Sequence, residues 1–142
     1  MKKFELTTES KINIFGKKLF RIKALISFGD VEKGETGGWI EKEENLEQSS
    51  GNAWVYGDAE VYGDARVYGD ADYTTIHGFG TQFRTTTFFR CKDKQIRVSC
   101  GCFFGTISEF REQVKNTRKG KIAEEYLMIA DLMEKHFAEE AK

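Results

Sequence analysis

The chain has 142 residues, 39% of them hydrophobic, and a net charge of −1, which excludes a general electrostatic attraction to nucleic acid or to a membrane surface. No apolar run approaches the ~18 residues that span a bilayer, and the N-terminus lacks the apolar core of a secretion signal. Because three cysteines, an odd number, fit a reducing compartment better than a disulfide framework, we expect a cytoplasmic protein folded as a single domain, 1–142.

Residues 1–36 predict a β cap at the N-terminal end of the fold. Residues 11–15 and 18–25 are rich in apolar residues, and Gly16 and Lys17 between them suit a turn, so these stretches predict a hairpin. Proline is absent from the chain, so the turns depend on Gly, Asn and Asp.

A repeat of six residues runs from Gly51 to Thr74. Four hexapeptides share a Gly-Asp or Gly-Asn corner, a small residue, a variable residue, a large apolar residue and then Tyr or Thr. A fixed short period is typical of solenoids, and six residues leave room only for one strand and one corner. The repeat therefore predicts a short parallel β-helix of about two coils across residues 37–76.

Strand alternation divides the repeat into inward and outward side chains. We expect these to point inward: Ala53, Val55, Ala59, Val61, Ala65, Val67, Ala71 and Tyr73. We expect these to point outward: Trp54, Tyr56, Glu60, Tyr62, Arg66, Tyr68 and Asp72. Because exposed aromatic patches commonly mark interfaces, the outward aromatic residues Trp54, Tyr56, Tyr62 and Tyr68 predict packing between subunits.

Residues 77–105 predict a β-hairpin with a four-residue loop at 92–95. In that register Arg90 lies opposite Arg97, and like charges directly opposite each other destabilise a sheet. Two facing guanidinium groups beside hydroxyl groups favour a bound phosphate or carboxylate. The inner face of this hairpin is expected to contain Phe83, Phe89, Cys91, Ile96, Val98 and Cys100. The predicted anion site on the outer face consists of Arg84, Thr86, Arg90, Arg97 and Ser99.

The alternative is that the two arginines are neutralised within the chain, by glutamates of the helical tail that residues 106–142 predict. Thr106 and Glu109 have the spacing of a capping box at the start of a helix. A second helix is expected from about residue 121 to residue 138. The expected apolar faces consist of Ile107, Phe110 and Val114 in the first helix, and Ile122, Tyr126, Ile129, Met133 and Phe137 in the second.

The repeat resembles the left-handed β-helix family of hexapeptide-repeat proteins, in which a small residue precedes the large inward residue by two positions. The resemblance implies a left-handed coil and a homotrimer. Most of the chain, from about residue 22 to residue 137, also resembles a group of uncharacterised bacteriophage and prophage proteins. The matching segments are 28–31 (Phe-Gly-Asp-Val), 37–46, the repeats themselves and 98–103. This second resemblance implies a phage accessory protein with no settled activity.

The resemblance to the hexapeptide-repeat family raises two enzymatic possibilities. Carbonic anhydrases of this fold hold a metal with three histidines, and the chain has only two. Acyltransferases of this fold use one histidine as a base, so His77 is the candidate catalytic residue of an alternative hypothesis. The spacing of Cys100 and Cys102 is a poor match to structural zinc sites, and Cys91 and Cys100 are expected to pack as small hydrophobic residues. We expect no metal and no cofactor.

The leading hypothesis is a non-catalytic phage-type protein that counteracts host defence in the bacterial cytoplasm. It would sequester an anionic nucleotide signal or block a host defence protein, as anti-CRISPR proteins do. The alternatives are a small acyltransferase that uses His77 and a structural or self-assembling phage component.

Overall fold

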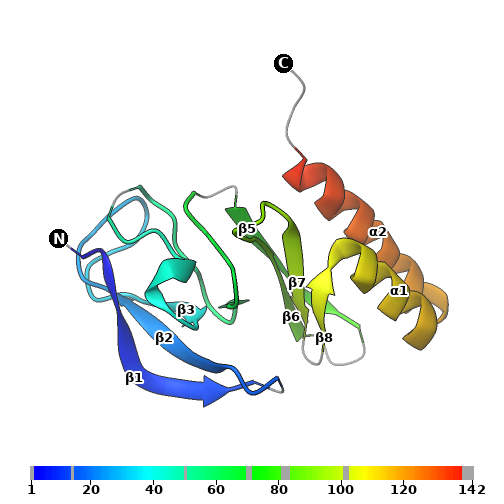
Figure 1. The fold of residues 1–142 in the computed structure, drawn as a ribbon, viewed down its shortest axis with the longest axis horizontal. Helices are drawn as coiled ribbons and strands as arrows, with labels where there is room; N and C mark the ends of the chain where they lie inside the picture. The colour runs from blue at the N-terminus through cyan, green and yellow to red at the C-terminus, as the bar shows by residue number, and fades with distance from the viewer. Residues whose placement is uncertain are drawn as a thin grey trace.

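The computed structural model describes residues 2–13, 15–49, 51–69, 72–80, 84–100 and 103–138. These residues form two four-stranded β-sheets followed by two helices (Figure 1). The first sheet contains β1 (Phe4–Ile12), β2 (Lys18–Ala24), β3 (Thr36–Ile40) and β4 (Glu60–Val61). The second sheet contains β5 (Tyr73–Phe79), β6 (Arg84–Arg90), β7 (Ile96–Cys100) and β8 (Phe103–Thr106). The helices are α1 (Ile107–Thr117) and α2 (Gly120–Phe137), and a short 3₁₀ helix, η1 (Glu43–Asn45), follows β3.

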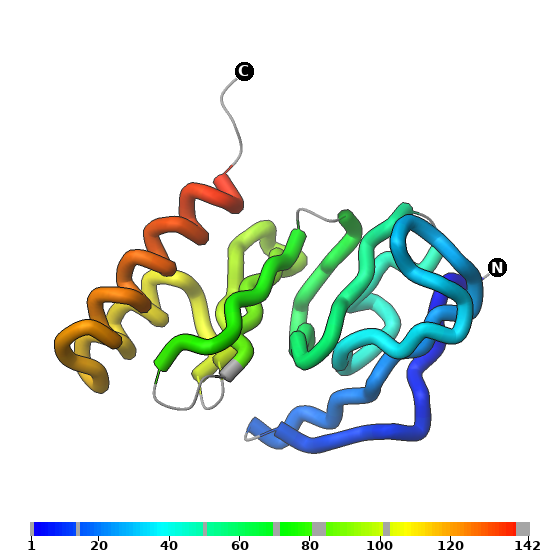
Figure 2. Tube along the Cα trace, turned by 180° about the vertical axis from the view of Figure 1, so that it is seen from behind, coloured from blue at the N-terminus to red at the C-terminus, as the bar shows by residue number. Residues whose placement is uncertain are grey.

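The second sheet is the middle layer of the molecule, with the first sheet and the repeat on one side and the helix pair on the other (Figures 1 and 2). Phe88 and Phe89 are consecutive in β6 and both are fully buried, but they belong to different cores. Phe89 packs with the first sheet and the repeat, whereas Phe88 packs with both helices. The sheet is therefore covered on both faces.

The prediction of a left-handed parallel β-helix is wrong. The second sheet is antiparallel throughout, and the first sheet has a single parallel pair, β3 with β4. Within the described part of the repeat, 51–69 and 72–74, only Glu60 and Val61 of β4 and the last residues, which enter β5, form strand. A solenoid coil is stabilised by pairing with similar coils on both sides. Here the repeat has a parallel neighbour on one side only, and on the other side Ala65 bridges antiparallel to Cys91 of the second sheet.

The inward face of the repeat is nevertheless the predicted one. Each of these six residues is at most 1% exposed: Ala53, Val55, Ala59, Val61, Ala65 and Val67. They form one core with Phe4, Ile22 and Phe89, and Tyr73 packs partly buried against it. Gly57 and Gly63 have positive φ angles of 55° and 66°, as the corners between hexapeptides require. Ala71 lies outside the described residues.

Two of the four aromatic residues predicted to face outward are buried instead. Trp54 is 1% exposed beneath Phe4 and Phe28, and Tyr62 is 2% exposed against Phe89. The prediction failed because elements distant in sequence cover those sides of the repeat. Tyr56 and Tyr68 are exposed by 50% and 43%, as expected. A subunit interface that includes Trp54 and Tyr62 is therefore excluded in this fold, while oligomerisation itself stays a prediction.

The N-terminal hairpin forms as predicted, but β1 begins at Phe4 instead of residue 11. Contacts distant in sequence extend it: the side-chain carbonyl of Gln48 accepts hydrogen bonds from the backbone N–H groups of Lys3 and Phe4, at 2.7 and 2.9 Å. The buried ammonium group of Lys3 also donates to the carbonyl oxygen of Ala53 at 2.8 Å. No local pattern in the sequence marks this anchoring.

The helical tail is confirmed. Thr106 Oγ1 accepts a hydrogen bond from the N–H of Glu109 at 3.1 Å. The N–H of Thr106 in turn donates to Glu109 Oε1 at 2.9 Å, which completes the capping box. The predicted apolar faces of both helices pack against β6 and β7, with Ile122 only partly buried. Among the described residues, neither helix combines the length and the apolar character needed to cross a membrane.

Candidate anion-binding site

Arg90 and Arg97, the two arginines predicted to face each other, lie on opposite faces of the second sheet. Arg90 pairs with Ile96, and Phe89 pairs with Arg97, so the register differs by one residue from the prediction. The cause is the turn, in which Cys91 N donates to Gln95 O at 2.9 Å and Lys94 adopts a left-handed φ of 68°. This is a three-residue loop instead of a four-residue loop. A one-residue shift moves every side chain of one strand to the other face relative to the neighbouring strand, so Arg97 shares a face with Phe89 and Arg90 shares the other with Ile96.

Each arginine has a carboxylate partner within the chain. Arg90 Nε lies 3.1 Å from Asp72 Oδ1, and Arg90 Nη2 donates to the carbonyl oxygen of Phe137 at the end of α2, at 3.3 Å. Arg97 Nη2 lies 2.8 Å from Asp93 Oδ2 in the turn. The alternative of internal neutralisation is thus the one that the geometry favours, although the partners are aspartates of loops and not glutamates of the helices.

The remaining predicted residues are also dispersed. Thr86 donates to Cys100 Sγ at 3.1 Å. Ser99 lies on the face of the sheet that Tyr62 covers, and it donates to the hydroxyl oxygen of Tyr62 at 3.2 Å. Only the backbone of Arg84, at the start of β6, is described. His77 is exposed in β5, where its Nδ1 lies 2.8 Å from Thr85 Oγ1. The structure therefore does not assemble the predicted set into one site.

The cysteines behave as packing residues where they are described. Burial, the largest cause, raises the pKa of the Cys91 thiol to about 11, so the thiol is protonated at neutral pH. Among the described residues, no group of three or more His, Cys, Asp or Glu side chains is arranged to hold a metal ion. Cys102 lies outside the described residues.

A different group of charged residues comes together beside η1, and Asn45 positions it. Asn45 is fully buried, and its Oδ1 accepts hydrogen bonds from the N–H groups of Glu41 and Lys42 at 3.2 and 3.1 Å. Its Nδ2 donates to the carbonyl oxygens of Gly63 and Ala65, both at 3.1 Å. One side chain thus fixes the β3–η1 loop against the third hexapeptide.

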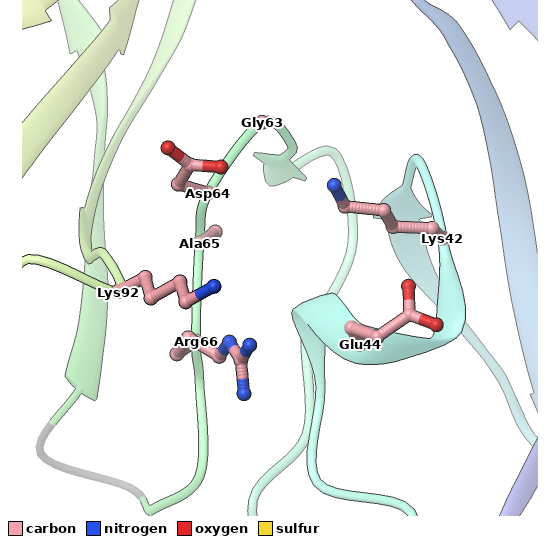
Figure 3. Close-up of a pocket in the computed structure, with 7 residues that line it drawn as sticks. All are labelled: Lys42, Glu44, Gly63, Asp64, Ala65, Arg66 and Lys92. Atoms are coloured by element: carbon pink, nitrogen blue, oxygen red, sulfur yellow. The ribbon is translucent and has the colours of Figure 1, made fainter.

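The β6–β7 turn adds the third segment. Lys92 N donates to Asp64 O at 2.7 Å, and Arg66 N donates to Arg90 O at 2.8 Å. With the Ala65–Cys91 bridge, these bonds hold the turn beside the third hexapeptide. A cavity of about 210 Å³ opens between the three segments, lined by Lys42, Glu44, Gly63, Asp64, Ala65, Arg66 and Lys92 (Figure 3).

Three cations and two carboxylates line this cavity. Figure 3 shows the ends of Lys92 and Arg66 reaching into it from one wall, with Lys42 extending from the opposite wall. Among the described residues, no hydrogen bond or ion pair joins the side chains of Lys42, Lys92, Glu44 or Asp64 to another group, and the guanidinium of Arg66 bonds only to the hydroxyl of Tyr68. Most of the donors on the three cations therefore remain available to a ligand.

No profile of a known protein family matches this sequence, and no curated protein matches it either. The resemblance to phage hexapeptide-repeat proteins therefore stays a prediction.

Neither Lys42 nor Lys92 was predicted from the sequence as a site residue. They lie 50 positions apart in the chain, and neither belongs to a local motif. Arg66 was placed correctly as an outward residue of the repeat, but outward direction alone does not distinguish a ligand-binding side chain from a solvated one. Asn45 was not predicted either, because its neighbours in the sequence are mostly charged residues and nothing local marks it as buried.

Proposed function

We propose that the protein is a non-catalytic binding protein for a small anionic ligand, held at the cavity of Lys42, Arg66 and Lys92. The observation that supports this most directly is the convergence of three cations on one concave site, none of them paired with a carboxylate among the described residues. A charged ligand oxygen would accept hydrogen bonds from several of these donors at once.

The cavity is preorganised, which favours binding. Its walls are tied together by the four hydrogen bonds of Asn45 and by the two backbone bonds between the third hexapeptide and the β6–β7 region. A ligand therefore does not have to order the backbone when it binds, which lowers the entropic cost of association.

We propose the same biological role that the sequence predicted. The protein would counteract host defence in a bacterial cytoplasm, by sequestering an anionic signal or by blocking a host protein. The described side-chain contact of His77 is with the hydroxyl of Thr85 and brings no carboxylate beside the ring, which argues against the acyltransferase alternative.

Isothermal titration calorimetry with inorganic phosphate tests the binding function. We expect saturable binding that Lys92→Ala weakens by about 10- to 100-fold, the size of a lost hydrogen bond to a charged group. Lys121→Ala, an exposed lysine of α2, is the matched control and should leave affinity unchanged. Absence of phosphate binding by the parent, or equal affinity of the Lys92→Ala and Lys121→Ala variants, would contradict the proposal.

A further inference from the structure

We propose that the ligand is a nucleotide, whose phosphate occupies the cavity of Lys42, Arg66 and Lys92 and whose base stacks on Tyr68. This inference rests on the proposed function and names its ligand class. The volume of the cavity is consistent with a phosphate group. A cavity of about 210 Å³ is smaller than the about 300–1,000 Å³ of pockets that enclose a whole drug-sized ligand. It suits the charged part of a ligand whose remainder lies on the rim.

Tyr68 is an exposed aromatic residue in contact with Arg66, which lines the cavity. It is the last residue of the third hexapeptide, and its hydroxyl oxygen accepts a hydrogen bond from Arg66 Nη1 at 2.8 Å. The central carbon of the guanidinium lies 5.7 Å from the ring centroid. The guanidinium therefore lies over one face of the ring, at the long end of the cation–π range. Tyr68 is nevertheless 43% exposed, so ring surface remains open to a ligand.

Hydrogen bonds to Asp72 hold the backbone at Tyr68 in place. Asp72 Oδ2 accepts hydrogen bonds from the N–H groups of Tyr68 and Gly69, at 3.0 and 2.9 Å. The other oxygen of Asp72 pairs with Arg90, which in turn donates to Phe137 O at the end of α2. Arg90, expected from the sequence to bind the anion, instead positions the segment that carries the ring.

A fixed, exposed aromatic ring beside a cluster of cations is the arrangement that recognises a base and its phosphate together. Every nucleobase has a flat π face, so stacking on tyrosine is favourable and tolerates different bases. An inorganic anion or a sugar phosphate would use the cavity alone and leave Tyr68 without a role.

The test compares three probes by titration calorimetry: AMP, ribose 5-phosphate and inorganic phosphate. We expect the parent to bind AMP about 5- to 150-fold more tightly than ribose 5-phosphate, the contribution of one stacked base. Tyr68→Leu should remove this difference while ribose 5-phosphate binds as before. Tyr68→Phe, which keeps the ring and loses the contact with Arg66, should retain most of it.

Tyr56→Leu is the matched control, because Tyr56 occupies the same position in an earlier hexapeptide and is 50% exposed. It should bind AMP like the parent. Equal affinity of the parent for AMP and ribose 5-phosphate would overturn the nucleotide inference and leave the anion-binding function standing. Failure of all three probes to bind would overturn both. Circular dichroism and melting curves of each variant confirm that it is folded before its affinity is compared.

Discussion

Replacing Asn45 with alanine should be one of the most destabilising polar substitutions in this chain. Asn45 is fully buried and forms four hydrogen bonds of 3.1–3.2 Å that join two stretches of backbone. Each such bond contributes about 0.5–1.5 kcal/mol net, and two of the groups left behind are carbonyl oxygens of the third hexapeptide. We therefore expect Asn45→Ala to lower the free energy of unfolding by about 3–4 kcal/mol.

Urea denaturation followed by circular dichroism measures this loss. Asn116→Ala provides the control, because Asn116 is exposed in α1 and a surface change of this kind alters stability by no more than about 0.5 kcal/mol. Asn45→Asp separates hydrogen bonding from volume: it keeps the acceptor and loses the donor, so a carboxylate would face two carbonyl oxygens. A loss below about 1 kcal/mol in Asn45→Ala, or a parent-like Asn45→Asp, would refute the view that Asn45 fixes the site.

Three further predictions concern Cys91, Tyr62 and Tyr56. Because burial raises the pKa of Cys91 to about 11, the unfolded chain loses the thiol proton at a lower pH than the native chain does, and native stability should fall as pH rises towards that value. Denaturation across alkaline pH should show a shallower fall in Cys91→Ala than in the parent, and equal slopes would argue against it. Tyr62→Glu should unfold the protein, since it places a charge at a position 2% exposed; a folded variant with parent melting would contradict the packing. If the exposed tyrosines join subunits, Tyr56→Glu should lower the mass measured by light scattering, and a monomeric parent would end the trimer prediction.

The features predicted correctly from the sequence are the ones set by near neighbours. Alternation of small and large residues identified the buried face of the repeat, from Ala53 to Val67. The capping box needed only Thr106 and Glu109. Such patterns depend on the local chain and are therefore visible without the fold.

The errors have a common physical origin, which is burial from two sides. Phe88 and Phe89 are both fully buried, so alternation of polar and apolar residues could not fix the register of β6 against β7. The second sheet, through Phe89, also covers Tyr62, which would be exposed on an isolated coil. The candidate site was missed because Asn45 and the β6–β7 turn bring its residues together from three separate segments.

The position of Phe89 and Cys91 has a consequence for the order in which this chain acquires its structure. Both residues belong to the core of the first sheet and the repeat, although they come well after the repeat in sequence. During synthesis, the N-terminal part cannot close that core until the second sheet has emerged from the ribosome. A fragment that ends after the repeat would carry an open hydrophobic side and should aggregate. Because the two halves share this core, we expect them to unfold in a single cooperative transition.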